Sequence, residues 1–207
     1  RLDRILKAEG RSPDAYKVAK QADVLMMFYL LPLDEIQEVF ERLGYRMDKN
    51  ILRRNYEYYL KRTSHGSTLS KVVHGYVAQL LNRRREAWDW FQDVLRSDVE
   101  DTQGGTTPEG IHTGVMGGSI DFVVRGYAGI QLRNDRITCD PQLPAEWKKL
   151  QFRLLYRGRW VNISLSQTEI NVTLQKDSLR KQPLTFEVTG RKFELQPGRP
   201  LTVPLKN

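Results

Sequence analysis

The sequence is poor in cysteine, in long apolar runs and in the residue patterns that bind metals. Its one cysteine, Cys139, excludes a disulfide within the chain and is typical of a reducing compartment, so we expect a cytoplasmic protein. No apolar run approaches the roughly 20 residues that span a bilayer, and no basic leader precedes an apolar signal core. Because the first residue is Arg rather than Met, we expect an internal or C-terminal piece of a longer soluble protein.

Other missing patterns disfavour several classes of chemistry. The three histidines have no ligand spacing, and there is neither a His-Glu-x-x-His pair nor a cysteine pair, so we expect no metal. The Gly-x-Ser-x-Gly elbow of a serine hydrolase is also missing. The net charge of +8 would suit binding to a polyanionic partner, yet the basic residues are mixed with 25 acidic ones. The cluster Arg83-Arg84-Arg85 is explained by a solvated loop between helices, which leaves nucleic acid as a minority interpretation.

The hydrophobic pattern changes near residue 130. Before that point apolar residues recur with helical spacing, and after it every apolar run alternates with a period of two. We therefore predict an α+β chain with two domains, residues 1–130 and residues 131–207. The second domain is predicted to be a small antiparallel β-sandwich that supports the first rather than reacting itself. Its expected strands are residues 150–156, 161–165, 170–174, 184–188, 193–195 and 201–205.

Helices are predicted along the whole first domain. The expected segments are residues 15–31, 34–43, 48–60, 69–81, a stretch around 87–95, and 113–127. The second half of the first segment is apolar nearly all round, which is typical of a helix buried on all sides, whereas the segment from Leu69 carries one apolar stripe. Buried and surface helices then alternate, as in a ring of inner helices wrapped by outer ones. Short helices in any large all-α domain give the same pattern.

A polar loop precedes the helix predicted from Leu69. It reads Thr63-Ser64-His65-Gly66-Ser67-Thr68-Leu69-Ser70. The first turn of a helix offers unpaired N–H groups and the positive end of the helix dipole, so an imidazole and several hydroxyls beside it suit an oxyanion or phosphate. The alternative is an ordinary Ser/Thr cap with His65 as a plain loop residue.

A second polar loop leads into the helix predicted from Thr113. It reads Thr106-Thr107-Pro108-Glu109-Gly110-Ile111-His112-Thr113 and places another histidine at a helix start. Positive charge is disfavoured there unless an anion is present, so bound phosphate would suit His65 and His112 alike. The alternative for each is a hydrogen-bonded loop residue. His74 lies one turn into its helix, and we expect a structural role for it.

The segment Lys20-Gln21-Ala22-Asp23 places an ammonium, an amide and a carboxylate at the entrance to the apolar helix. A desolvated charge costs several kcal/mol unless it is paired, which indicates a pocket where these groups meet a polar ligand or each other. An ion pair between Lys20 and Asp23 at a partly exposed helix end is the alternative, and both interpretations stay open.

Four segments together resemble glycoside hydrolase family 65 in their order and spacing. They are Lys20-Gln21-Ala22-Asp23-Val24-Leu25, the loop His65-Gly66-Ser67-Thr68-Leu69-Ser70, Glu109-Gly110-Ile111-His112 and Asp140-Pro141-Gln142-Leu143-Pro144. The family contains the inverting maltose, trehalose and kojibiose phosphorylases and some related hydrolases. The resemblance implies the C-terminal part of an (α/α)6 barrel, built from helical hairpins, followed by a small β-sandwich.

The same resemblance implies roles for individual residues. Lys20 and Gln21 match positions that bind the transferred glucosyl unit. The positions that line the family's phosphate pocket match His65, Ser67, Thr68, Ser70 and His112. In related phosphorylases an acidic residue often follows the loop histidine, whereas this chain has Gly66, which leaves the acceptor sugar and the disaccharide open.

The implied reaction is a single displacement. A carboxylic acid protonates the glycosidic oxygen while phosphate attacks the anomeric carbon from the opposite face. The resemblance places that acid, a glutamate, upstream of residue 1, so we expect the chain alone to be inactive. The expected partners are an α-linked glucosyl disaccharide, inorganic phosphate as co-substrate and the N-terminal part of the same enzyme. We expect no cofactor, nucleic acid or membrane, and a homodimer stays open.

Two alternatives to a phosphorylase remain at this stage. A hydrolase of the same family, trehalase-like, would need a carboxylate in the place of phosphate. A non-catalytic module would use the helices as an interaction scaffold and the sandwich as a carbohydrate-binding unit.

Overall fold

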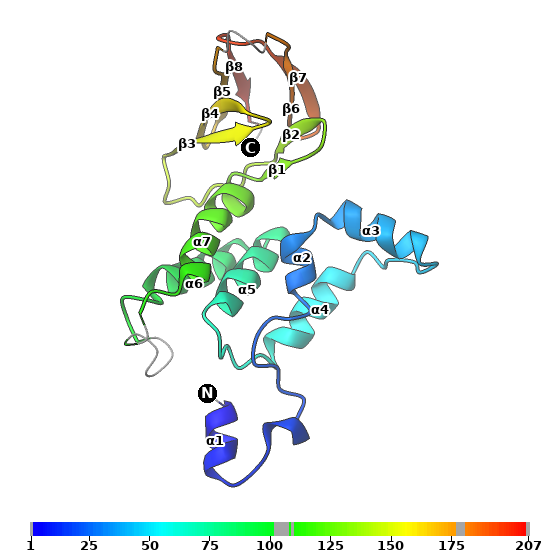
Figure 1. The fold of residues 1–207 in the computed structure, drawn as a ribbon, viewed down its shortest axis with the longest axis vertical. Coiled ribbons are helices and arrows are strands. Elements are labelled where there is room, and N and C mark those ends of the chain that lie inside the picture. Colours follow the sequence, from blue (N-terminus) through cyan, green and yellow to red (C-terminus); the bar gives the residue numbers. More distant parts are fainter. Residues whose placement is uncertain (1, 102–107, 109, 177–180, 206–207) are drawn as a thin grey trace. The chain divides into compact units, whose positions relative to one another are not determined.

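The change from helical to alternating apolar spacing is reflected in two structural units. The computed structural model describes residues 2–101, 108, 110–176 and 181–205. The first unit is Arg1–Phe122 and the second is Val123–Asn207 (Figure 1). The alternating pattern itself begins slightly later than the second unit, with a strand at Ile130. Among the described residues, no helix combines the length and the apolar character needed to cross a bilayer.

The first unit is helical. Its elements are α1 (Leu2–Ala8), the 3-10 turn η1 (Pro13–Ala15), α2 (Met26–Leu30), α3 (Leu33–Arg42), α4 (Ile51–Leu60), α5 (Leu69–Leu80), α6 (Arg84–Arg96) and α7 (Thr113–Asp121), with a π-helical stretch η3 (Phe122–Tyr127) directly after α7. The helices predicted near residues 34–43, 48–60, 69–81 and 87–95 are therefore present. The predicted helix over 113–127 is also present, with α geometry in its first part and π geometry in its last turns.

Helix α5 forms the centre of this unit. It packs against α2, α4, α6 and α7, and every residue from Ser70 to Gln79 is buried. Most of the apolar stripe predicted for this helix is buried, including Val72, Val73, Tyr76 and Val77. The polar side of the helix is buried as well, as Lys71 and His74 show, so the helix is not one-sided. Gly75 permits the close packing, since a Cβ atom there would lie 2.7 Å from Cε1 of Phe122 and 2.9 Å from Cβ of Trp90.

The helix predicted over residues 15–31 is wrong for most of its length. Only η1 and α2 are helical, and Ala19 instead forms a parallel bridge with Thr63. This pairing is non-local, so helical spacing within the segment could not reveal it. The predicted burial on all sides is also wrong, because Leu30 is 59% exposed and Leu31 is 42% exposed.

The second unit is a β-sandwich of two four-stranded sheets. Their strands are β1 (Ile130–Leu132), β2 (Arg136–Cys139), β3 (Lys149–Tyr156), β4 (Arg159–Ser166), β5 (Glu169–Leu174), β6 (Leu184–Val188), β7 (Arg191–Leu195) and β8 (Pro200–Pro204). One sheet has the order β1-β2-β6-β7 and the other β3-β4-β5-β8. Figure 1 shows the two sheets facing each other, and alternate residues along β4, β5 and β6 are buried.

The alternating pattern predicted six of these strands, β3 to β8, close to their observed bounds. It missed β1 and β2, which are only 3 and 4 residues long. The sheets are not purely antiparallel, because β2 pairs with β6 in parallel. Gly129 is required just before β1: its φ is +63°, and a Cβ atom there would lie 2.0 Å from the backbone oxygen of Asp140.

Candidate functional site

Main-chain hydrogen bonds join the Lys20 segment to the loop that precedes α5. The amide of Ser64 donates to the Ala19 carbonyl at 2.8 Å, and the amide of Gly66 donates to the Lys20 carbonyl at 2.7 Å. Two segments more than forty positions apart in the sequence therefore lie side by side. The backbone of the predicted sugar-binding segment is thus fixed directly to the backbone of the predicted phosphate-binding loop.

The side chains of Lys20 and Gln21 are exposed. The amide nitrogen of Gln21 donates to Asp23 Oδ1 at 2.9 Å. Among the described residues no ion pair joins Lys20 to Asp23, so the carboxylate of Asp23 orients Gln21 rather than neutralising the ammonium group. Lys20 is left at the surface, next to the loop, where its charge remains hydrated.

His65 adopts a conformation that a non-glycine residue rarely takes. Its φ is +48°, in the left-handed region. Its Nδ1 atom is hydrogen-bonded to the hydroxyl of Ser70 at 3.1 Å, and its ring packs against His74 and Trp90 with centroid distances of 4.7 and 4.9 Å. Strained backbone held by packing on several sides is concentrated at functional sites, which is a reason to consider this residue functional.

Burial keeps His65 uncharged at neutral pH. Desolvation, followed by the charges of His74 and Lys71, lowers the pKa of His65 from its usual value to about 4. A neutral imidazole has one donor and one acceptor nitrogen, so it can take part in a hydrogen-bonded network without bringing a charge. An anion bound beside the ring would favour the charged form and raise this pKa.

His74 supports the loop from within α5. It is fully buried, and its Nδ1–H donates to the Ser70 carbonyl at 2.9 Å. Burial lowers its pKa. Its Nε2 atom is buried without a hydrogen-bond partner in the described part of the chain. Because its ring contacts His65 edge to face, His74 helps to fix the orientation of that residue, which agrees with the structural role expected for it.

The hydroxyls of the loop do not form the ordinary cap. Thr68 is at the N-cap position of α5, yet its backbone is helical and its side chain makes no capping hydrogen bond. Thr68 and Ser70 are buried, whereas Ser67 is only half-buried. Of these three, Ser70 uses its hydroxyl for His65. The capping alternative considered for this loop is therefore not realised by Thr68.

Lys71 is a buried cation that the sequence analysis did not single out. Its side chain is 9% exposed, and its Nζ atom lies 3.5 Å from Oδ2 of Asp93 in α6. It lies in the first turn of α5 and is close enough to His65 to affect the pKa of that ring. A buried ammonium group near the start of a helix adds to the positive potential of the site.

His112 is held by a carboxylate. It is the N-cap residue of α7, and its Nδ1–H donates to Oδ1 of Asp98 at 2.7 Å while its main-chain N–H donates to Oδ2 at 2.8 Å. Asp98 is 9% exposed and His112 is 28% exposed. Because both oxygens of Asp98 hold one residue, the ring of His112 is fixed with Nε2 on the side away from the carboxylate. Thr106, Thr107 and Glu109 of this motif lie outside the described residues.

The C-terminal end of α6 connects the two histidine loops. Asp93, in its last turns, pairs with Lys71 at the start of α5, and Asp98, just beyond its end, holds His112 at the start of α7. Helix α7 also packs directly on α5, where a Cβ atom on Gly118 would lie 3.0 Å from Cγ1 of Val72. The first turn of α5, directly after the His65 loop, and the His112 loop are thus both bound to the C-terminal part of α6.

Sequence reasoning missed Trp90, Lys71 and Asp98. Each acts through a residue on another element, and neither spacing nor composition indicates such contacts. Within the described ranges, no group of three or more His, Cys, Asp or Glu side chains is arranged to hold a metal ion.

The two units match two domains of one enzyme family. Residues 1–121 match the central catalytic domain of glycosyl hydrolase family 65, and residues 130–195 match the C-terminal domain of that family. The chain thus has parts of two domains of this class of enzyme, a helical unit that matches the central domain and a β-sandwich that matches the C-terminal domain. The chain is a member of glycosyl hydrolase family 65.

Its relatives include disaccharide phosphorylases. The chain is 44% identical over 203 residues to an uncharacterized glycosyl hydrolase of Mycobacterium tuberculosis, covering 98% of this chain and 15% of that protein. It is 41% identical over 181 residues to the trehalose 6-phosphate phosphorylase of Lactococcus lactis, covering 87% of this chain and 24% of that enzyme. The solved structure of a candidate kojibiose phosphorylase from the human microbiome matches with a TM-score of 0.73 and 26% identity over 92% of this chain and 25% of the other. The chain therefore spans a quarter or less of the length of these relatives.

Proposed function

We propose that this chain is the C-terminal region of an inverting disaccharide phosphorylase, which transfers glucose from an α-glucoside to inorganic phosphate. The observation that carries the proposal is that both helix starts preceded by a histidine loop are bound to α6 and its C-terminal end. At the start of α5, His65 packs on Trp90 and Lys71 pairs with Asp93. At the start of α7, Asp98 holds His112. Family membership adds weight, because relatives at 29–41% identity are named trehalose 6-phosphate, α,α-trehalose and kojibiose phosphorylases.

In this proposal phosphate is held by the two helix starts. The hydroxyls of Ser67, Thr68 and Ser70 and the imidazoles of His65 and His112 supply its hydrogen bonds, and the helix ends together with Lys71 supply the positive potential. Charge-assisted hydrogen bonds of about 1.5–3 kcal/mol each would hold the nucleophile in line with the anomeric carbon. Lys20 and Gln21, on the segment paired with the His65 loop, bind the glucosyl unit beside it.

The reaction is a displacement with inversion. A phosphate oxygen forms a bond to the anomeric carbon while the bond to the glycosidic oxygen breaks, and a carboxylic acid protonates the departing oxygen. An α-glucoside then gives β-glucose 1-phosphate and the free acceptor sugar. No second carboxylate is needed, because phosphate replaces the activated water of an inverting hydrolase.

The proposal also assigns parts that the chain does not supply. We place the helical unit in the C-terminal part of an (α/α)6 barrel and the general acid in the remainder of that barrel. The enzyme would use no cofactor and act in the cytoplasm, and whether it forms a homodimer is a separate question.

The test is product analysis with the full-length protein that contains this chain. Trehalose 6-phosphate is the first disaccharide to try, because the relative of that name is 41% identical whereas the α,α-trehalose and kojibiose enzymes are 29% identical. We expect glucose 1-phosphate to form only when phosphate is present. Release of glucose in the absence of phosphate would instead identify a hydrolase of the family.

A substitution separates the phosphate site from the sugar site. Ser67→Ala should raise KM for phosphate more than KM for the disaccharide, because a donor to the anion is lost. Ser166→Ala, a half-buried serine at the end of β4 in the second unit, is the matched control and should change neither. A larger effect of Ser67→Ala on the sugar would reassign the loop to sugar binding.

A further inference from the structure

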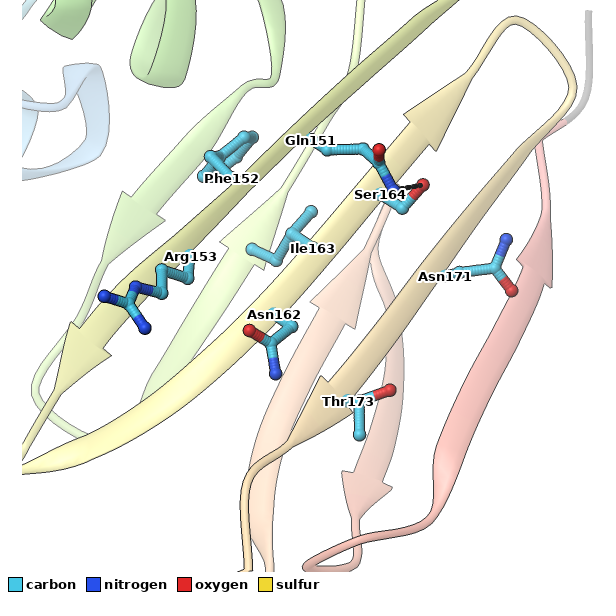
Figure 2. A pocket seen from close by; sticks show the side chains of 8 residues that line it. All are labelled: Gln151, Phe152, Arg153, Asn162, Ile163, Ser164, Asn171 and Thr173. Atoms are coloured by element: carbon cyan, nitrogen blue, oxygen red, sulfur yellow. Dashed lines mark hydrogen bonds between the residues drawn. The ribbon is translucent and has the colours of Figure 1, made fainter.

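The outer face of the sheet β3-β4-β5-β8 carries a hollow lined by amides and hydroxyls. It is a shallow depression, open to solvent, with a volume of about 460 Å³. The polar side chains that line it are Gln151, Arg153, Asn162, Ser164, Asn171 and Thr173 (Figure 2). All six lie at outward-facing positions, because their neighbours in β4 and β5 are buried in the core of the sandwich.

The strand register arranges these side chains in two rows across the sheet. Gln151 lies opposite Ser164, which lies opposite Asn171, and Arg153 lies opposite Asn162, which lies opposite Thr173. The first row is joined by a 3.4 Å hydrogen bond from the side-chain amide of Gln151 to the Ser164 hydroxyl. At its other end the Thr202 hydroxyl of β8 donates to the side-chain oxygen Oδ1 of Asn171. Side chains two residues apart on a strand point to the same face of the sheet. The two rows therefore lie next to each other on the outer face, and each strand contributes one residue to each row.

An aromatic ring continues this face. Trp160 is the next outward residue of β4 beyond Asn162, and it is 37% exposed. The guanidinium carbon of Arg153 lies 4.5 Å from the centre of its ring. The ring is thus held at the surface beside the rows rather than buried in the core.

We propose that this outer face binds a neutral oligosaccharide. A pyranose ring carries hydroxyls around its rim and C–H groups on its faces. Side-chain amides and hydroxyls offer donors and acceptors to the rim, and an exposed indole offers a flat apolar partner to a face. This site lies in the second unit and does not depend on the phosphorylase proposal.

The charge of the lining favours a neutral ligand. Among the eight residues that line the hollow, Arg153 is the single charged one. At the edge of the hollow the carboxylate of Glu169 accepts a hydrogen bond from the side-chain amide of Asn171 at 2.8 Å, so the positive charge of Arg153 is accompanied by a negative one. A polyanion would call for several cations. A peptide that pairs with a sheet binds along an edge strand, whereas these groups lie on the face of β3, β4 and β5.

The test is a titration of the ¹⁵N-labelled 207-residue chain with maltoheptaose and, separately, with cellohexaose. The side-chain NH₂ signals of Gln151, Asn162 and Asn171 report on the site directly. We expect at least one of these sugars to shift them in a saturable manner. The double variant Asn162→Ala, Asn171→Ala should weaken that binding about tenfold or more, as expected for the loss of two amide partners. Trp160→Ala should also weaken it.

The matched control is Thr185→Ala, a polar residue on the outward side of the other sheet, which should leave the sugar affinity unchanged. Backbone spectra of the variants show that the sandwich remains folded. Three results would overturn the proposal: no shift with either sugar, equal affinity in the double variant, or shifts of these amides by inorganic phosphate alone, which would indicate an anion at Arg153.

Discussion

The two histidines at helix starts have opposite surroundings, although their sequence contexts look alike. His65 is packed between His74 and Trp90, bonds a hydroxyl and stays neutral because burial lowers its pKa to about 4. His112 is instead clamped by both oxygens of Asp98. The position of a histidine before a helix therefore does not determine its charge state or its hydrogen-bond partner. Side chains from α6 and its C-terminal end decide whether the ring is buried among aromatics or held by an acid.

The largest effect should come from removing either ring. In the full-length protein, His65→Ala and His112→Ala should each lower kcat/KM for phosphate by roughly 10²–10³, which is typical for the loss of one preorganised donor to developing charge. Steady-state kinetics with phosphate varied at saturating disaccharide measures this. If one variant keeps wild-type kinetics, that histidine is not a phosphate ligand, and the two histidines do not share a phosphate site.

A smaller loss is expected when the histidines are kept and their partners are changed. Asp98→Asn removes the charge that holds His112 and should lower kcat/KM for phosphate roughly 10–100-fold, as for other residues that orient a ligand-binding histidine. Ser70→Ala removes a neutral partner of His65 and should cost less. The variant Asp98→Glu, which restores the charge on a longer arm, should recover part of the activity. An Asp98→Asn enzyme with unchanged phosphate KM and kcat would show that the clamp is purely structural.

Sequence reasoning succeeded where contacts are local. The strands β3 to β8 follow the alternation of buried and exposed residues, which depends on the two-residue repeat of a strand and on little else. The shorter strands β1 and β2 escaped detection because 3 and 4 residues give too little alternation. Residues near Ala19 were predicted to be helical from local spacing alone. That spacing could not reveal their pairing with Thr63, because Thr63 is remote in the sequence.

The candidate site was predictable in its loops but not in its supports. The polar sequence around His65 and His112 could be recognised because hydroxyls and histidines stand next to helix starts. Asp98, Lys71 and Trp90 could not, since each is placed by packing between helices. The left-handed conformation of His65 is likewise set by the contacts of its ring and by the pairing of the next amide with Lys20.

A substitution in the core should disturb one histidine and spare the other. Gly75→Ala forces a Cβ atom to within 2.9 Å of Trp90 Cβ and 2.7 Å of the Phe122 ring, so it should lower the free energy of unfolding by about 1–3 kcal/mol. Because Trp90 touches His65, the ring signals of His65 should shift while those of His112 do not. Gly117→Ala is the control, since nothing lies within 4 Å of its Cβ position and the change should be neutral or stabilising by up to about 1 kcal/mol. Equal stability of the two variants would contradict the close packing of α5 on α6.

The smallest effect is a protonation that can be followed directly. In an NMR titration of the isolated chain, His65 should titrate near pH 4, because desolvation and then the charges of His74 and Lys71 lower its pKa to about 4. The unfolded chain binds a proton at the ordinary value of about 6.5, so stability should fall as the pH drops from about 6.5 towards 4, and His74 acts in the same direction. Lys71→Met removes one of the charges and should raise the pKa of His65. Added phosphate should also raise the pKa of His65, whereas a buffer of the same ionic strength without phosphate or sulfate should not. If the His65 ring titrates near 6.5 when no such anion is present, His65 is not buried in solution.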